Sequence, residues 1–149
     1  KMFFCWLFSN AKNKNILEET KDIHSRNIQI VEFIKNMEMA YSAADVIVSR
    51  AGAIAISELA IAKKPVLLVP FPFAAEDHQT KNAQTLVEKN ATKMVKDTEM
   101  KDKFWNTLSE ICENEDLRTE MAQNLEFFAK PKATEEIVKE IFKNLNIKE

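Results

Sequence analysis

The chain has 149 residues, of which 46% are hydrophobic and 30% are charged, and its 21 basic and 23 acidic side chains leave a formal net charge of −2. This length supports one buried core, and the near-balanced charge argues against nucleic acid as a partner. Cys5 and Cys112 lie far apart without metal-ligand spacing, so we expect neither a disulfide framework nor a zinc site. No apolar run approaches the roughly 20 residues that a membrane-spanning helix needs.

Short apolar segments alternate with segments of helical period along the first two thirds of the chain. We expect strands at residues 2–8, 28–33, 46–49, 66–69 and 92–95. This alternation predicts an α/β fold, in which helices cover both faces of a parallel sheet. After residue 98 the pattern is helical throughout, and it predicts three closing helices, with Asn114 as the N-cap of the second and Pro131 between the last two.

Gly52, the single glycine of the chain, follows the expected strand at 46–49 and precedes a helical segment. One glycine excludes both the dinucleotide fingerprint and the P-loop, because each motif needs at least two. The free N–H groups of a helix's first turn can bind an anion, and a glycine lets a phosphate come close to the backbone. This turn therefore predicts a diphosphate site. Glu58, about one turn into the helix, either accepts hydrogen bonds from ribose hydroxyls or is a solvated helix residue.

A second candidate loop, stiffened by two prolines, follows the expected strand at 66–69. Asp77 is a candidate cap for the next helix. His78, Gln79 and Asn82 would bring donors and acceptors to the open first turn of that helix, which suits sugar hydroxyls. A histidine at a helix start is alternatively a surface or capping residue, and the sequence leaves both roles open.

Six motifs occur in a defined order: FIKNM (33–37), AYSAAD (40–45), SRAGA (49–53), SEL (57–59), KPVLLVPFP (64–72) and DHQTKNA (77–83). Together they resemble the MurG family of peptidoglycan glycosyltransferases, which move N-acetylglucosamine from its UDP donor onto lipid I to make lipid II. The similarity is ordered over residues 28–90 and continues loosely through the closing helices.

The resemblance implies that residues 1–149 are one domain, the Rossmann-like, C-terminal, donor-binding half of a GT-B glycosyltransferase. It implies that the backbone of Ile34 contacts uracil, that the turn after the strand at 46–49 lies beside the nucleotide and diphosphate, and that Glu58 holds the ribose. The residues implied to bind the donor are Ile34, Arg50, Gly52, Ala53, Ile54, Ala55, Glu58, His78, Gln79 and Asn82. No metal and no organic cofactor are expected from this resemblance.

The sequence departs from the family pattern in several places. Ala55 stands where the family often has threonine, and Lys63 replaces a glycine before the Lys-Pro pair. The family's GGSxGA loop with its strand, and the N-terminal domain that binds lipid I and would supply the catalytic base, do not precede the matching part. We therefore interpret the chain as a fragment, inactive alone, of a protein that associates peripherally with the cytoplasmic face of the bacterial inner membrane.

The leading hypothesis is the UDP-N-acetylglucosamine-binding part of an inverting, metal-independent glycosyltransferase, with lipid I reached through the missing domain. One alternative is a donor-binding subunit that needs a separate membrane-bound partner. Another is an inactive remnant that has kept the core and lost the ligand. Binding of a uridine nucleotide separates the remnant from the other two hypotheses.

Overall fold

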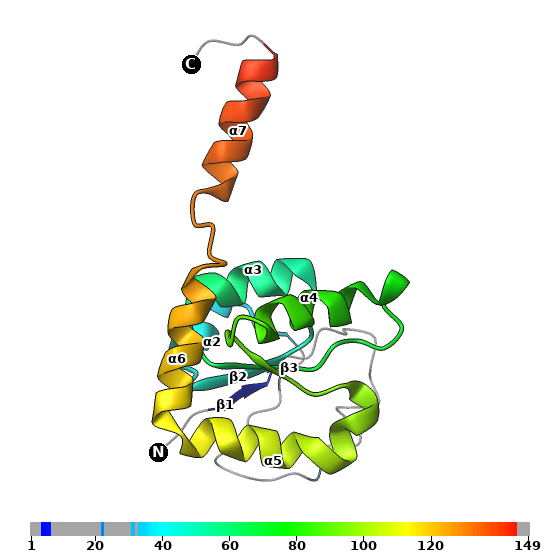
Figure 1. Cartoon of the computed structure of the whole chain (residues 1–149). Helices are drawn as coiled ribbons and strands as arrows, with labels where there is room; N and C mark the ends of the chain where they lie inside the picture. Colours follow the sequence, from blue (N-terminus) through cyan, green and yellow to red (C-terminus); the bar gives the residue numbers. More distant parts are fainter. Residues whose placement is uncertain (1–3, 7–21, 23–30, 32, 146–149) are drawn as a thin grey trace.

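The computed structural model describes residues 4–6, 22, 31 and 33–145. These residues form a parallel sheet of four strands in the order β1-β2-β3-β4 (Figure 1). The strands are β1 (Phe4–Trp6), β2 (Val46–Ser49), β3 (Val66–Leu68) and β4 (Lys93–Met94). The helices are α2 (Met37–Ala43), α3 (Ala53–Ala62), α4 (His78–Val87), α5 (Met100–Glu113), α6 (Glu115–Glu126) and α7 (Ala133–Asn144), with 3-10 turns at Ala75–Asp77 (η1) and Asp97–Glu99 (η2).

The observed strands confirm the predicted α/β class, with one difference near the start of the chain. The strand expected at 46–49 agrees with β2 residue for residue, while β3 and β4 are shorter than expected. In the segment expected to be a strand at 28–33, the structure describes only Val31 and Phe33, and neither is in a strand. Both side chains are exposed, so the apolar pattern there does not mark a buried strand at these two positions. The remaining positions of that segment, and residues 2–3 and 7–8 of the first expected strand, lie outside the described residues.

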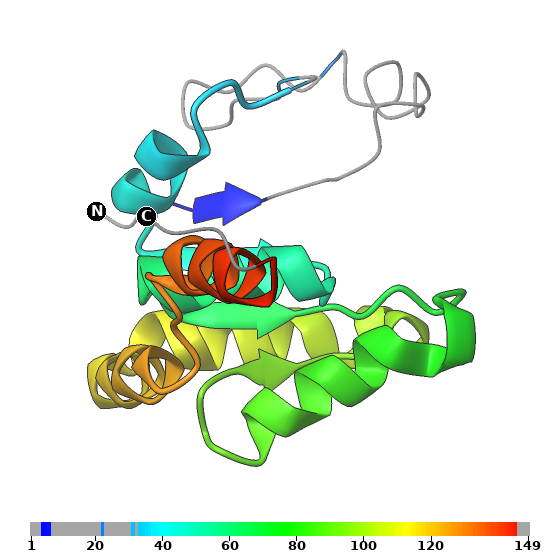
Figure 2. The ribbon, with the colours of Figure 1, turned by 90° about the horizontal axis from the view of Figure 1, so that it is seen from above.

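Helices cover both faces of the sheet because successive side chains of its central strands point in opposite directions. Ile47 of β2 packs in a cluster with residues of α2, α3 and α4. Its neighbours Val46 and Val48 pack on the other face in a cluster with residues of α5. Helix α6 contributes to both clusters, through Leu125 to the first and Met121 to the second. Figure 1 shows α3 and α4 on one side of the sheet and α5 on the other, and Figure 2 shows the same ribbon from above, with the strands side by side.

The three predicted closing helices are observed as α5, α6 and α7. Asn114 caps α6 as predicted, since its Oδ1 accepts a hydrogen bond of 2.9 Å from the backbone N–H of Leu117. Helix α7 projects away from the sheet (Figure 1) and has no buried residue. Within the described part of the chain, no helix combines the length and apolar character needed to cross a membrane.

Lys63 ends α3 in the left-handed conformation, with φ of 51°. Glycine is favoured at this position because a side chain there clashes with the backbone. The ammonium group of Lys63 pairs with Glu126 of α6, and both side chains are about half exposed (48% and 62%). The left-handed backbone of Lys63 therefore destabilises the fold, and the exposed ion pair with Glu126 offsets only a small part of that cost.

We predict that Lys63→Gly stabilises the chain by about 1 kcal/mol, because relief of the left-handed strain outweighs loss of the exposed ion pair. Urea unfolding measures the change. The matched control is Glu126→Gln, which removes the ion pair alone and is expected to change the free energy of unfolding by less than about 0.5 kcal/mol. A Lys63→Gly variant less stable than the control would show that the ion pair is the larger effect.

Candidate functional site

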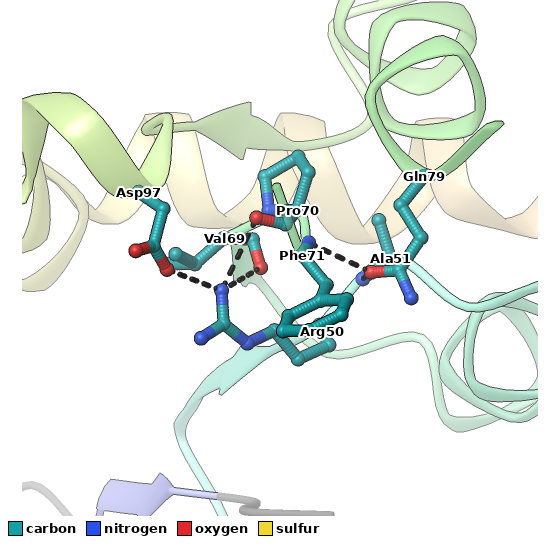
Figure 3. A network of polar contacts seen from close by, with 7 residues as sticks. All are labelled: Arg50, Ala51, Val69, Pro70, Phe71, Gln79 and Asp97. Atoms are coloured by element: carbon teal, nitrogen blue, oxygen red, sulfur yellow. Dashed lines mark hydrogen bonds and ion pairs between the residues drawn. The ribbon is translucent and has the colours of Figure 1, made fainter. Parts of the chain in front are cut away.

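Segments that follow three parallel strands meet at the carboxyl edge of the sheet. Residues 50–52 follow β2, residues 69–73 follow β3, and η2 comes shortly after β4. Ligands of open α/β sheets bind at this edge, since loops from several strands converge there. Figure 3 shows the polar contacts that join these segments.

Arg50 connects all three segments through one nitrogen of its guanidinium group. Its Nη1 donates to the carbonyl oxygens of Val69 (3.2 Å) and Pro70 (3.1 Å) and to Oδ1 of Asp97 (2.6 Å). The guanidinium carbon lies 5.7 Å from the centre of the Phe71 ring, within range of a cation–π contact. The ion pair with Asp97 is about 40% exposed, so solvent screening limits its contribution to roughly 0–1 kcal/mol. Arg50 therefore acts mainly by fixing where the three segments lie relative to one another.

Gln79, at the start of α4, joins the segment after β2 to the segment after β3 through its side-chain oxygen. Oε1 accepts hydrogen bonds from the backbone N–H groups of Ala51 (3.2 Å) and Phe71 (2.9 Å). Asn82, one turn further along α4, donates through Nδ2 to the carbonyl oxygen of Ala51 (3.3 Å). Within the described residues, the Nε2 group of Gln79 and Oδ1 of Asn82 make no hydrogen bond. Each amide is thus held by the protein at one end and has its other end available for a ligand.

The first turn of α3 forms an open backbone surface at the same edge. Gly52 is the N-cap residue, and no side chain caps the helix there. Its φ of −69° is accessible to any residue, so the backbone conformation does not require glycine. A Cβ atom built on Gly52 would meet nothing within 4 Å, which places open space directly over the start of the helix. Free N–H groups and the positive end of the helix dipole together make this space suitable for an anion.

Glu58 lies on α3 beyond this first turn, and its carboxylate is held by a residue of α2. The hydroxyl of Tyr41 donates a hydrogen bond of 2.8 Å to Oε2 of Glu58. Tyr41 is only 8% exposed, whereas Glu58 is exposed. The sequence pattern gave no indication of this contact.

His78 is exposed at the first position of α4, and its Nδ1 donates a hydrogen bond of 2.6 Å to the carbonyl oxygen of Ala75. The prediction that Asp77 caps this helix is wrong. Asp77 occupies the N-cap position, but its φ is 55° and its side chain makes no capping hydrogen bond. The tight 3-10 turn at 75–77 causes this difference, because it holds both Asp77 and Glu76 in the left-handed conformation.

The structure brings together most of the residues predicted to bind a donor. Arg50, the first turn of α3, Gln79 and Asn82 are joined by the contacts above, and Glu58 lies on the same helix as that turn. Ile34 precedes α2, is half-buried, and makes no hydrogen bond to the other predicted site residues in the described part of the chain. Its contact with uracil stays a prediction. Asp97 was missed, although its place after β4 at the carboxyl edge could have indicated it.

The surroundings of Cys112 and Glu99 shift the pKa of each side chain. Cys112 lies on α5, and burial raises the pKa of its thiol. The thiol is a poor nucleophile because a raised pKa disfavours the reactive thiolate. The hydrogen bond from Lys103 lowers the pKa of Glu99, which lies on the surface at the end of η2. Within the described residues, His, Cys, Asp and Glu side chains form no group of three or more that could hold a metal ion.

Residues 8–140 match the family model described as the glycosyltransferase family 28 C-terminal domain. Two similar relatives are each named UDP-N-acetylglucosamine--N-acetylmuramyl-(pentapeptide) pyrophosphoryl-undecaprenol N-acetylglucosamine transferase. The protein from Cytophaga hutchinsonii is 47% identical over 129 residues, which cover 87% of this chain and 35% of the relative. The protein from Bacteroides fragilis is 40% identical over 141 residues, which cover 94% of this chain and 37% of the relative.

Among solved structures, the crystal structure of Acinetobacter baumannii MurG matches with a TM-score of 0.77 and 34% sequence identity. The match covers 94% of this chain and 41% of that chain. This agreement identifies the fold as the Rossmann-like half of a GT-B glycosyltransferase. The chain spans about a third of the length of the curated relatives it matches.

We predict that Gln79→Leu destabilises the chain by about 2 kcal/mol, because it leaves the N–H groups of Ala51 and Phe71 without their acceptor. Gln79→Glu keeps an oxygen at that position and is expected to stay within about 0.5 kcal/mol of the original chain. Chemical denaturation compares the free energies of unfolding. Equal losses in both variants would show that the two backbone bonds are not what Gln79 contributes.

Proposed function

The chain belongs to the glycosyltransferase family 28 C-terminal domain family, and we propose that it binds the donor of an N-acetylglucosaminyltransferase of peptidoglycan synthesis. In this proposal residues 1–149 are the donor-binding domain, the donor is UDP-N-acetylglucosamine, and the acceptor is lipid I, which is converted to lipid II. The relatives' names, which combine this donor with an undecaprenol-linked acceptor, support the proposal.

The open first turn of α3 is the observation that carries the proposed donor site. We infer that the diphosphate accepts hydrogen bonds from the N–H groups of Ala53, Ile54 and Ala55, over the space that Gly52 leaves unfilled. The helix dipole would then stabilise the negative charge that develops on the diphosphate as UDP leaves. This requires no metal ion to neutralise the leaving group.

The sugar of the donor is assigned to the start of α4. Nε2 of Gln79 and Oδ1 of Asn82 have no hydrogen-bond partner among the described residues, and a sugar hydroxyl can both donate and accept. His78, exposed beside them, is a further candidate for the sugar. Arg50 holds the two turns between which this sugar and the diphosphate would lie.

The nucleoside is assigned to α3 and to the segment before α2. Glu58 would accept hydrogen bonds from the ribose hydroxyls, and the backbone of Ile34 would contact uracil. The acceptor hydroxyl then attacks the anomeric carbon as the bond to UDP breaks, so the configuration inverts. We assign the acceptor and the catalytic base to a part of the longer relatives that this chain does not span, working at the cytoplasmic face of the inner membrane with peripheral attachment.

Calorimetric titration of the chain with UDP-N-acetylglucosamine, UDP-glucose and ADP tests the proposal. We expect saturable binding of the uridine nucleotides and weaker binding of ADP. No binding of any uridine nucleotide to a folded chain would contradict the assignment of a donor site and would favour the inactive remnant. The alternatives with a bound donor differ only in whether the acceptor-binding part is fused or separate.

We predict that Gly52→Ala lowers the affinity for UDP-N-acetylglucosamine by about tenfold or more, because the new Cβ occupies the space over the start of α3 that the phosphate needs. The folded chain is expected to lose less than about 1 kcal/mol, since among the described residues the added atom meets nothing within 4 Å beyond its own chain neighbours, and the φ suits alanine. Calorimetry gives the affinity, and thermal unfolding gives the stability. Unchanged affinity in the variant would place the diphosphate away from this turn.

A further inference from the structure

The hydrogen bond between Tyr41 and Glu58 joins two helices at the edge of the core. Tyr41 belongs to α2 and Glu58 to α3, and 17 positions separate them along the chain. The ring of Tyr41 packs in the same buried cluster as Leu59, the neighbour of Glu58. The buried ring of Tyr41 therefore fixes the position of its hydroxyl, whereas Glu58, whose carboxylate accepts the bond, is exposed.

An exposed glutamate normally samples several rotamers, and fixing one of them costs conformational entropy. A hydrogen bond from a rigid donor restricts that sampling before any ligand arrives. A carboxylate only accepts hydrogen bonds, and its two oxygens offer about four acceptor positions. Tyr41 uses one position on Oε2, and no other described residue hydrogen-bonds to Oε1, which can accept from a ligand that carries paired hydroxyl donors.

We propose that Tyr41 is a positioning residue that holds the Glu58 carboxylate for the ribose diol and thereby sets the preference for ribonucleotides over deoxyribonucleotides. This inference rests on the proposed donor site. Glu58 is five residues along α3 from Ala53, a rise of about 7.5 Å, so phosphate and diol would be bound at different points of one helix. Tyr41 acts on the diol alone, through the carboxylate, and makes no contact with the phosphate in this arrangement.

The alternative role for Tyr41 is packing, in which the hydroxyl only satisfies its own hydrogen-bonding need. The two roles differ in their effect on ligand selectivity. A packing role alters the affinity for all nucleotides alike, because it acts through the stability and shape of the α2–α3 contact. A positioning role alters only the affinity that depends on the ribose hydroxyls.

The test titrates the chain and its Tyr41→Phe variant with UDP and with 2′,3′-dideoxy-UDP. Phenylalanine keeps the buried ring and removes the hydroxyl. We expect the affinity for UDP to fall by about tenfold and that for 2′,3′-dideoxy-UDP to change by less than about twofold. In a Glu58→Gln background, Tyr41→Phe is expected to produce no further loss of UDP affinity, because the two residues act as one unit.

Ser57→Ala is the matched control, because it removes a hydroxyl next to Glu58 whose one hydrogen bond among the described residues is to the carbonyl oxygen of Ala53 in the same helix (3.0 Å). In Ser57→Ala, the ratio of the affinity for UDP to that for 2′,3′-dideoxy-UDP is expected to equal the ratio in the original chain. Equal losses for both nucleotides in Tyr41→Phe, or no loss for either, would overturn the positioning role while leaving the donor site intact. An original chain that binds neither nucleotide would instead refute the proposed function itself, and the inference with it.

Discussion

The side-chain oxygen of Gln79 accepts hydrogen bonds from two backbone N–H groups that belong to the turns after different strands, Ala51 after β2 and Phe71 after β3. No regular secondary structure pairs these turns with each other, so their N–H groups need a side-chain acceptor. Arg50 fixes the same two segments from the other side, through the carbonyl oxygens of Val69 and Pro70. Arg50 as a donor and Gln79 as an acceptor thus hold the two turns together at the edge of the sheet where the ligand would bind.

The hydrogen bonds of Arg50 and Gln79 determine which polar groups at this edge can still bind a ligand. Because Nη1 of Arg50 and Oε1 of Gln79 are engaged within the protein, they hold the loops rather than the ligand. The N–H groups at the start of α3, where Gly52 leaves open space, are one set of anion-binding groups left at this edge. A site built from backbone dipoles needs little reorganisation when charge develops on a leaving diphosphate. In the proposed donor complex, the open start of α3 and the Tyr41–Glu58 pair would bind the phosphate and the ribose along the same helix.

The sequence predicted what depends on local pattern and missed what depends on contacts between distant residues. A short run of β-branched apolar residues indicated β2 to the residue, and the side chain of Asn114 indicated the start of α6, because each signal lies within or directly beside the element. The partners Asp97 of Arg50 and Tyr41 of Glu58 were not recognised, since 47 and 17 positions separate them along the chain. The expected cap by Asp77 failed because an unforeseen 3-10 turn sets its backbone.

A crystal structure of the chain with UDP-N-acetylglucosamine bound tests the central claim most directly. The account predicts diphosphate oxygens within hydrogen-bond distance of the N–H groups of Ala53, Ile54 and Ala55. It also predicts that Oε1 of Gln79 keeps its bonds to Ala51 and Phe71, so that only its Nε2 faces the sugar. A diphosphate bound away from the start of α3, or a Gln79 side chain released from both turns, would contradict it.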